Sequence, residues 1–284
     1  APSKKSDYNN NILLEDRILK EALKEEGISS DRKIWSDPKI DWTGAKHLLF
    51  RTTWDYYSRF DEFRKWLFGL EGKVNIINGL KTIEENLDKR YLIKLAERGV
   101  AIPETRLLQK GETFQLEELI EEYNIDKAII KPCISAAARD TYVIDKNNAL
   151  EYSRLLNRLL KNENFLFQKF EDNVMEKGEV SMMYFGGKYT HSILKLAKPG
   201  DFRVQDDFGG TVHEYSAGDS LLQFCEKVLQ ALDTVPDYAR FDILWNDHGE
   251  PLLSELELLE PELWFRFNPE AAMVFARHLK QKYF

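Results

Sequence analysis

The chain has 284 residues, of which 43% are hydrophobic and 31% charged, a balance typical of soluble globular proteins with two or three domains. Its 40 basic and 48 acidic side chains give a net charge of −8, which argues against a nucleic-acid-binding protein and against binding to an anionic membrane surface. Small molecules are therefore the expected partners.

Cys133 and Cys225 are the two cysteines, and neither lies in a metal-binding or redox spacing. A disulfide framework is therefore not expected, and the reducing cytoplasm is the predicted compartment. No apolar run is long enough to span a membrane, and the opening stretch, APSKKSDYNNN, lacks the apolar core of a signal peptide.

The first third of the chain predicts a small parallel sheet with helices. A helix over 11–26 carries an apolar stripe, and Gly27 can end it. The other predicted elements are three strands and one helix, in the order 33–35, 47–50, 61–70 (the helix) and 73–77. Strands that alternate with helices imply right-handed crossovers and parallel pairing, although the usual strand before the first helix is missing.

Polar residues follow the second of these strands, in the run RTTWD at 51–55. Because parallel sheets bind ligands at the carboxyl ends of their strands, this run is a candidate for substrate contact. The alternative is that Trp54 and Tyr56 plug the loop against the domain, and the sequence does not decide between the two.

The middle of the chain predicts a small α+β unit that acts as a lid. Asp88 can cap a helix, and Gly99 can end it. The elements that follow are strands and helices, at 105–108, 116–123 (helix), 128–130, 142–144, 146–160 (helix) and 164–170.

The last part of the chain predicts an antiparallel sheet. Gly186 and Gly187 lie between two alternating runs, which is a strong signal for a type I′ hairpin. A second hairpin is predicted in YARFDILWNDHGEPLLSELELLE, residues 238–260, where 246–249 supply the turn.

The second hairpin carries an unusual set of charges. Alternation places Glu255 and Glu257 on one face of the returning strand, and antiparallel pairing brings Asp242 opposite or diagonal to them. Like charges that face each other are destabilising, and when buried they cost more, unless a cation neutralises them. Oxygen ligands on adjacent strands suit Mg²⁺. The alternative is a solvated acidic edge made by Glu250, Glu255, Glu257, Glu260 and Glu262.

Three lysines stand where phosphate groups would need them. Lys89 is at a helix start, Lys131 ends a buried strand, and Lys195 is late in a hairpin strand. A lysine offers phosphate a compact charge with three donors. Taken singly, Lys89 and Lys195 fit solvated lysines better, whereas Lys131 follows Ala-Ile-Ile and precedes Pro132, which argues against plain solvation.

The motifs occur in a definite order: Lys89, IIKP with a small-residue loop, LFQKFE, GEVS, KPGDFRVQDDFGG, RFDIL and SELELLEP. This order resembles the ATP-grasp superfamily of carboxylate–amine ligases, and within it the glutathione-synthetase-like branch. The details TTWDYY, GDFRVQ and ELELLEP resemble the subgroup that includes an enzyme of D-cycloserine biosynthesis. The resemblance covers nearly the whole chain.

The resemblance implies an ATP-grasp fold of the α/β and α+β classes, in three parts. Residues 1–87 would form a pre-ATP-grasp domain with a parallel sheet, 88–170 a linker helix and a small lid, and 171–284 a C-terminal domain with an antiparallel sheet.

The resemblance also implies roles for individual residues. Lys89 and Lys131 would contact ATP phosphates, Gln168, Lys169 and Phe170 would line the hinge around adenine, and Glu179 would contact the nucleotide. Lys195 would lie by the γ-phosphate, and Arg203 near the transferred phosphoryl group or the carboxylate substrate. Asp242, Glu255 and Glu257 would hold magnesium ions, although the family more often has asparagine where Glu257 stands.

The lid loop departs from the family pattern. It is usually glycine-rich, so that backbone N–H groups close over the phosphates, but here it reads Ser135, Ala136, Ala137, Ala138 and Arg139. Either Arg139 adds its charge to the phosphates, or it is an exposed loop arginine.

The expected reaction uses ATP and Mg²⁺ to convert a carboxylate into an acyl phosphate, which an amine then attacks, with release of ADP and phosphate. Two alternatives stay open: a regulatory or scaffold module that binds ATP without turnover, and a ligase that closes a ring within one substrate. A homo-oligomer is possible. Alanine at Asp242 or Glu255 is expected to abolish turnover and to leave the fold intact or stabilised. His191 is expected to be a structural histidine rather than a proton acceptor.

Overall fold

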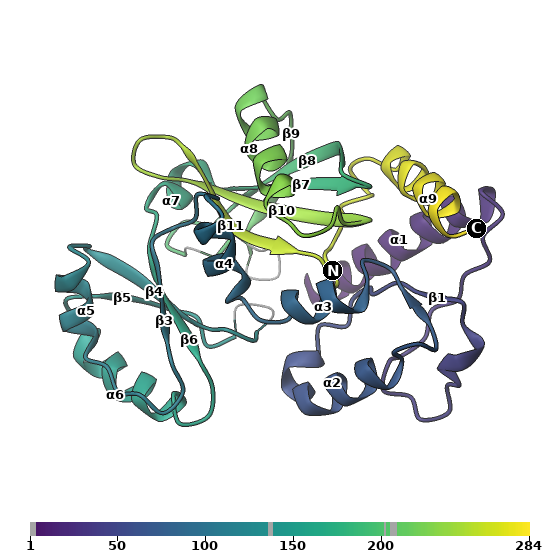
Figure 1. Cartoon of the computed structure of the whole chain (residues 1–284). Coiled ribbons are helices and arrows are strands. Elements are labelled where there is room, and N and C mark those ends of the chain that lie inside the picture. Colours follow the sequence, from purple (N-terminus) through teal and green to yellow (C-terminus); the bar gives the residue numbers. More distant parts are fainter. Residues whose placement is uncertain (1–3, 136–138, 202, 205–208) are drawn as a thin grey trace.

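The structure is a computed structural model that describes residues 4–135, 139–201, 203–204 and 209–284. Strands in these ranges form three separate sheets, of two, four and five strands. Figure 1 shows the five-stranded sheet above, with the four-stranded sheet below it on one side and the two-stranded sheet on the other. The predicted combination of a parallel sheet with antiparallel sheets is confirmed. Within the described ranges, no helix has both the length and the apolar character needed to cross a membrane.

The two-stranded sheet is parallel, as predicted, but smaller. β1 (His47–Leu48) pairs with β2 (Asn75–Ile76), and the helix α2 (Phe60–Gly69) lies between them in the chain. Two 3₁₀ turns belong to the same region, at Trp42–Gly44 and Tyr56–Arg59. A further helix, α3 (Leu80–Asn86), follows β2.

The predicted strand at 33–35 is wrong, because these residues form no strand in the structure. Trp35 is buried in this segment, and its ring meets Phe63 edge-on at a centroid distance of 5.2 Å. Packing among aromatic side chains, not strand pairing, therefore accounts for the apolar residue at this point.

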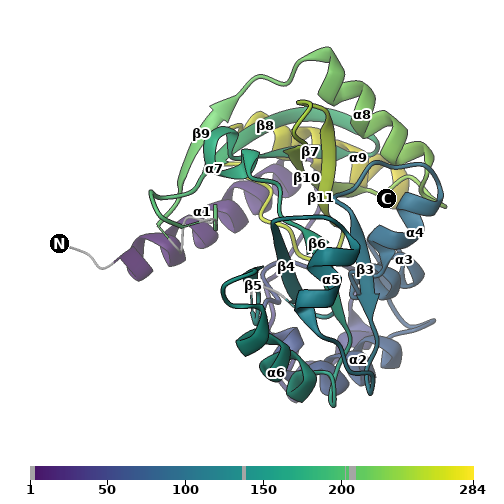
Figure 2. The same ribbon diagram turned by 90° about the vertical axis from the view of Figure 1, so that its left-hand side faces the viewer.

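The first helix, α1 (Lys4–Glu25), starts earlier than predicted and does not cover the small sheet. It packs against the last helix, α9 (Glu270–Tyr283), on the five-stranded sheet (Figures 1 and 2). Gly27 adopts a positive φ of 79° just beyond its end, the backbone that ends a helix and favours glycine.

A four-stranded sheet forms in the part of the chain that the sequence assigns to a lid, and this part is called the lid below. Its strands run in the order β3-β6-β4-β5, all antiparallel, and two helices cover one face (Figure 2). The elements of this region are α4 (Tyr91–Glu97), β3 (Thr105–Leu108), α5 (Leu116–Glu122), β4 (Lys127–Pro132), β5 (Tyr142–Asp145), α6 (Ala149–Leu159) and β6 (Phe165–Lys169). Three residues of the lid loop, Ala136, Ala137 and Ala138, lie outside the described residues.

The five-stranded sheet is antiparallel and runs in the order β11-β10-β7-β8-β9. Gly186 and Gly187 join β7 to β8 with φ values of 57° and 76°, which is the backbone that the predicted type I′ turn needs. The elements of this region are α7 (Asn173–Lys177), β7 (Glu179–Phe185), β8 (Lys188–Leu196), β9 (Thr211–Tyr215), α8 (Asp219–Gln230), β10 (Tyr238–Trp245), β11 (Pro251–Glu257) and α9.

One face of this sheet changes from apolar to charged along its strands. At one end of the face, Met183 and Tyr238 pack in the core with α1 and α9. Because side chains alternate along a strand, Ser181 and Asp242 lie further along the same face, paired across β7 and β10. The opposite face packs beneath α4 and α8. The charged half of the face is thus left to border the lid.

Candidate active site

A cleft of about 270 Å³ lies where the charged half of the large sheet meets the lid. The lid contributes Lys131, Gln168, Lys169 and Phe170, and the large sheet contributes Glu179, Lys195, Asp242, Glu255 and Glu257. Lys89 and Arg203 also line it. The structure therefore brings together the residues that the sequence predicted for nucleotide, metal and phosphoryl contacts, except Arg139. Of the run 51–55, which was a candidate for substrate contact, only Trp54 lines the cleft.

Three carboxylates form the floor of this cleft. Asp242 pairs with Glu255 in the register of β10 and β11, and Arg240 pairs with Glu257, so all three acids share one face. Asp242, Glu255 and Glu257 each offer an oxygen, and these oxygens lie within 4.8 Å of one another. The predicted facing of the acids across the hairpin is confirmed, and they line a cleft rather than a solvated edge.

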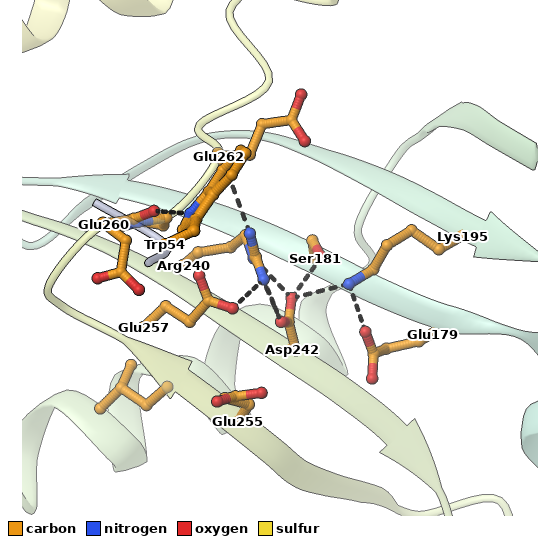
Figure 3. Close-up of polar contacts among 12 residues, drawn as sticks. Trp54, Glu179, Ser181, Lys195, Arg240, Asp242, Glu255, Glu257, Glu260 and Glu262 are labelled. Carbon is orange, nitrogen blue, oxygen red and sulfur yellow. Dashed lines mark hydrogen bonds and ion pairs between the residues drawn. The ribbon is translucent and has the colours of Figure 1, made fainter. Parts of the chain in front are cut away.

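Basic side chains bind these carboxylates in the structure (Figure 3). The Arg240 guanidinium donates to Asp242 Oδ2 at 2.7 Å and also to Glu257 Oε1. Lys195 Nζ contacts Glu179 and lies 3.4 Å from Asp242 Oδ1. Lys89 donates to Glu255. The cleft therefore holds alternating charges, which reduces the cost of burying them.

The pKa values of the acids follow from this pairing. Burial raises the pKa of Asp242, but Arg240 and Lys195 outweigh it and hold the pKa well below its usual range. Burial also opposes ionisation of Glu255, whose pKa is nevertheless lowered by Lys89 and Lys131. Burial, with repulsion from Glu255, raises the pKa of Glu257 to about 7 although Arg240 opposes the rise.

The donor set fits a hard divalent cation. Mg²⁺ binds one or two carboxylates and completes its octahedron with water and phosphate oxygens, and the three acids supply such ligands on rigid strands. A cation here would replace Arg240 and Lys89 as the partner of the acids and free these side chains for phosphate oxygens.

An apolar slot lies beside the charged floor. Phe170, Val174 and Val204 form a buried cluster, with Ile129 and Leu244 packed against it, and all five line the cleft. Lys131 stands on the lid strand β4 above the floor, and burial lowers its pKa although Glu255 opposes the fall. An aromatic base fits the slot, and its phosphates would then point toward the lysines.

Two predicted hinge side chains already have partners. Gln168 Nε2 donates to Thr105 Oγ1 at 2.8 Å, across β6 and β3, and Lys169 Nζ donates to Asp247 at 2.9 Å in the β10–β11 turn. Lys169 therefore links the lid to the large sheet.

Arg139 does not line the cleft. Its guanidinium donates a hydrogen bond to each carboxylate oxygen of Glu163, at 2.9 and 2.6 Å, and another to the Ile134 carbonyl at 2.8 Å. Arg139 is partly buried and fastens its own loop, so it is not the exposed loop arginine of one interpretation. The other interpretation, a contact with phosphate, stays a prediction.

Several residues of the site were not assigned from the sequence. Arg240 shares its face with Asp242 two positions later, so the alternation that indicated Asp242 could also have indicated Arg240. Ser181, Glu260 and Trp264 are also at the site or its rim, but their sequence context carries no signal that separates them from core and loop residues.

The chain is similar in sequence to known proteins. Residues 3–78 match the family model described as the N-terminal domain of D-cycloserine synthetase DcsG. The chain is 27% identical over 282 residues to the cycloserine biosynthesis protein DcsG of Streptomyces lavendulae, covering 93% of this chain and 92% of that protein.

The chain is also similar in structure to solved proteins. The crystal structure of D-cycloserine synthetase DcsG superposes with a TM-score of 0.84 at 26% identity, over 94% of this chain and 93% of that one. The ATP-grasp ligase PsnB complexed with minimal precursor has a TM-score of 0.65 at 14% identity, over 93% and 95% of the two chains, which shows the shared fold.

Proposed function

This chain is an ATP-dependent carboxylate–amine ligase of the ATP-grasp superfamily, and we propose that it binds Mg-ATP in the cleft between the lid and the five-stranded sheet. The observation that carries the proposal is the group of three carboxylates within 4.8 Å of one another, on the floor of a cleft that also contains Lys89, Lys131 and Lys195. A metal-bound triphosphate needs acids that bind the metal ion and basic side chains that bind the phosphates, and this cleft contains both.

Asp242, Glu255 and Glu257 would hold the magnesium, which neutralises phosphate charge and draws electrons from the transferred phosphorus. Lys89 and Lys131 would bind the phosphates. The slot around Phe170 would hold the adenine, with the backbone of Gln168 and Lys169 at its edge and Glu179 contacting the nucleotide. These roles rest on the family resemblance and on the position of each residue at the cleft.

In the reaction, an oxygen of the substrate carboxylate attacks the γ-phosphorus, ADP leaves, and an acyl phosphate forms. The amine nitrogen then attacks the acyl carbon, phosphate leaves, and the nitrogen loses a proton. Lys195 and Arg203 would stabilise negative charge on the transferred phosphoryl group and the acyl oxygen.

The proposed division of the chain is the one expected from the sequence. Residues 1–87 contain β1 and β2, residues 88–170 contain β3 to β6, and residues 171–284 contain β7 to β11. The boundaries therefore fall between sheets, which supports a pre-ATP-grasp domain, a lid and a C-terminal domain as separate functional parts.

Substrates are proposed to be small molecules that carry a carboxylate and an amine-type nitrogen. A second candidate is a substrate that carries both groups in one molecule, which the similarity to the protein called D-cycloserine synthetase DcsG favours. Mass spectrometry of the products would distinguish ring closure, in which the organic product has the mass of one substrate less water, from the joining of two substrates.

The direct test is Mg²⁺-dependent release of ADP on incubation with carboxylates and amines. We expect ATP to raise the melting temperature only when Mg²⁺ is present, and ADP to appear only with a suitable substrate. Mg-ATP binding without ADP release under any condition would favour a regulatory module. Absence of Mg-ATP binding would overturn the proposed function.

A further inference from the structure

The cleft extends beyond the three carboxylates to an end made by a loop of the chain after β11. Glu260 and Trp264 of this loop line that end, together with Trp54 and Tyr56 from the N-terminal part. In the view of Figure 3, the Glu260 carboxylate lies on the side of Glu257 opposite to Asp242.

Glu260 is a buried acid whose side chain has no partner among the described residues. The residue is 9% exposed, and its Oε2 atom is buried and accepts no hydrogen bond from the described residues. Two nearby cations act on its charge, Lys89 and Arg240, but these donate to Glu255 and to the Asp242–Glu257 pair. Burial, with repulsion from Glu257 and Glu255, raises the pKa of Glu260 well above its usual range.

The missing partner is not the result of a loosely held loop. The Trp54 indole donates to the Glu260 carbonyl at 3.0 Å, and Arg51 donates to the Pro261 carbonyl at 2.8 Å. On the other side, the Tyr238 hydroxyl donates to the Leu259 carbonyl at 2.6 Å. The backbone on both sides of Glu260 is thus fixed, so its side chain is held at the cleft.

A carboxylate in this position favours a cationic ligand. An unpaired buried acid costs free energy, which a positive ligand group would recover on binding. A metal ion is a poor candidate, because Glu260 does not belong to the group of acids whose oxygens lie within 4.8 Å of one another. A substrate ammonium group supplies one positive charge and three donors, and it suits a single carboxylate.

We propose that Glu260 binds the ammonium group of an amino-acid-like substrate, and that it thereby selects substrates that carry an amino group near the carboxylate to be phosphorylated. This inference rests on the proposed function, since it assumes that the substrate carboxylate lies over the three acids. Trp54 acts through the Glu260 backbone and is a positioning residue.

A second polar atom at this end also lacks a partner. Trp264 Nε1 is a buried donor that makes no hydrogen bond to the described residues, and Trp264 adopts a φ of 54°, which is rare for a bulky side chain. An amino-acid-like ligand offers both the donor that Glu260 needs and an oxygen acceptor for such an N–H group.

The test compares ligands with and without the ammonium group. Small amino acids, with D- and L-serine among them, and their deaminated analogues, such as 3-hydroxypropionate for serine, are titrated by calorimetry into the full chain with Mg²⁺ and a non-hydrolysable ATP analogue. We expect the wild-type protein to bind at least one amino acid more tightly than its deaminated analogue. The proposal would be overturned if the two members of every pair bound equally well, or if no member of any pair bound.

The variant Glu260→Gln keeps the shape of the side chain and removes its charge. It should weaken binding of the amino acid by about tenfold or more and should bind the deaminated analogue as the wild type does. Affinity for Mg²⁺ and the nucleotide should stay within about twofold. A preference for the ammonium form that survives the change would contradict the proposal, and so would a loss of nucleotide affinity, which would make Glu260 a metal or nucleotide ligand.

A matched control is Glu250→Gln, which makes the same change at an exposed glutamate on the β10–β11 turn. It should leave both affinities unchanged. Glu260→Gln should melt at or above the wild-type temperature, because it removes an unpaired buried acid, and a lower melting temperature would contradict the absence of a partner. If the wild type does not bind the nucleotide analogue, the proposed function itself is wrong. If it binds the analogue but does not prefer the ammonium form, only the role of Glu260 is wrong.

Discussion

Asp242 shows how a buried acid can be both repelled by its neighbours and necessary for the fold. The Ser181 hydroxyl and the Arg240 guanidinium donate to its oxygens, and Lys195 Nζ lies 3.4 Å away. Considered from the sequence, repulsion among the acids implied that alanine would leave the fold intact or stabilise it. The contacts argue against that expectation for Asp242, because alanine would leave Arg240 and Lys195 buried without their shared partner.

We therefore expect Asp242→Ala to lower the free energy of unfolding by about 3 kcal/mol, and also to abolish ATP turnover. Urea unfolding measures the first effect and ADP release the second. Asp126→Ala is the control, since Asp126 is exposed and does not line the cleft. A variant as stable as the wild type would show that Arg240 and Lys195 find other partners.

Lys131 gives a prediction of the opposite kind. Burial disfavours its charge and lowers its pKa, so the lysine is tolerated in the free protein rather than required by it. We expect Lys131→Met to weaken Mg-ATP binding by about tenfold or more while the melting temperature without ligand stays the same or rises. Calorimetric titration with ATP and a thermal melt test both parts. Unchanged ATP affinity would remove Lys131 from the phosphate site.

Single residues differ in how far the sequence predicts them. Asp242, Glu255 and Glu257 could be grouped because strand alternation and hairpin register are both readable from the chain. Arg139 could not be placed, because its partner Glu163 is 24 residues away and belongs to a different segment. The lack of a partner for Glu260 is a property of the assembled cleft and has no trace in the sequence.

At the scale of elements, strand β8 supports the loop that carries Glu260. His191 of β8 is buried, and its Nε2 and the Leu263 carbonyl are 3.1 Å apart, while Nδ1 lies 2.9 Å from the Thr190 hydroxyl. A neutral imidazole satisfies both contacts by donating from Nε2 and accepting at Nδ1. Burial lowers its pKa to about 4 from the ordinary 6.5, although the backbone hydrogen bonds oppose the fall. The structural role that the sequence favoured for His191 agrees with these contacts.

This shift makes stability depend on pH. The unfolded chain binds a proton to His191 more readily than the folded chain does. The contribution of the neutral imidazole to the free energy of unfolding is therefore full above pH 6.5 and is lost as the pH falls toward 4. The loss amounts to about 3 kcal/mol. We expect His191→Gln to lose less stability than the wild type between pH 7.5 and pH 4.5, as measured by urea unfolding. Equal losses in the two proteins would mean that the imidazole stays neutral in both states or charges freely.

Elements with a clear repeat were predictable, and isolated apolar residues were not. The β7–β8 and β10–β11 hairpins follow from two-residue alternation and from turn residues with positive φ, such as Gly186 and Gly187. The strand expected at 33–35 failed because the burial of Trp35 depends on Phe63 and Trp66, which lie on a helix later in the chain. Local pattern cannot distinguish these two reasons for an apolar side chain.

On the scale of the whole molecule, the N-terminal part is joined to the large sheet by more than chain connectivity. Asn78, which follows β2, donates to the carbonyls of Tyr238 and Leu258, at 2.9 and 2.8 Å. Its Oδ1 accepts from the backbone N–H of Asp237 at 2.6 Å. Asp237 in turn binds His278, Lys282 and Tyr283 of α9. These contacts connect the parallel sheet, the large sheet and the last helix.

The position of α1 adds to this connection, since the first helix packs on α9 and shares a core with β7 and β10 rather than with β1 and β2. A boundary at residue 87 therefore divides the chain by sheet and by proposed role, but the first helix and the C-terminal part share apolar surface. Segments that share a buried core unfold together unless the interface between them is small.

We accordingly expect residues 1–87 and 171–284 to unfold in one cooperative transition, and Asn78→Ala to lower its free energy by about 3 kcal/mol. Alanine would remove the side-chain partner of two carbonyls and two backbone N–H groups, and it would also occupy a backbone with a φ of 70° that asparagine tolerates better. Urea unfolding followed by tryptophan fluorescence, which reports on Trp35, Trp42, Trp54 and Trp66 in the first part and on Trp245 and Trp264 in the last, should coincide with circular dichroism in the wild type. Asn147→Ala, at an exposed asparagine of the lid, is the matched control. Two separate transitions in the wild type would show that residues 1–87 are an independent unit. Asn78→Ala would then weaken only the docking of residues 1–87 onto residues 171–284.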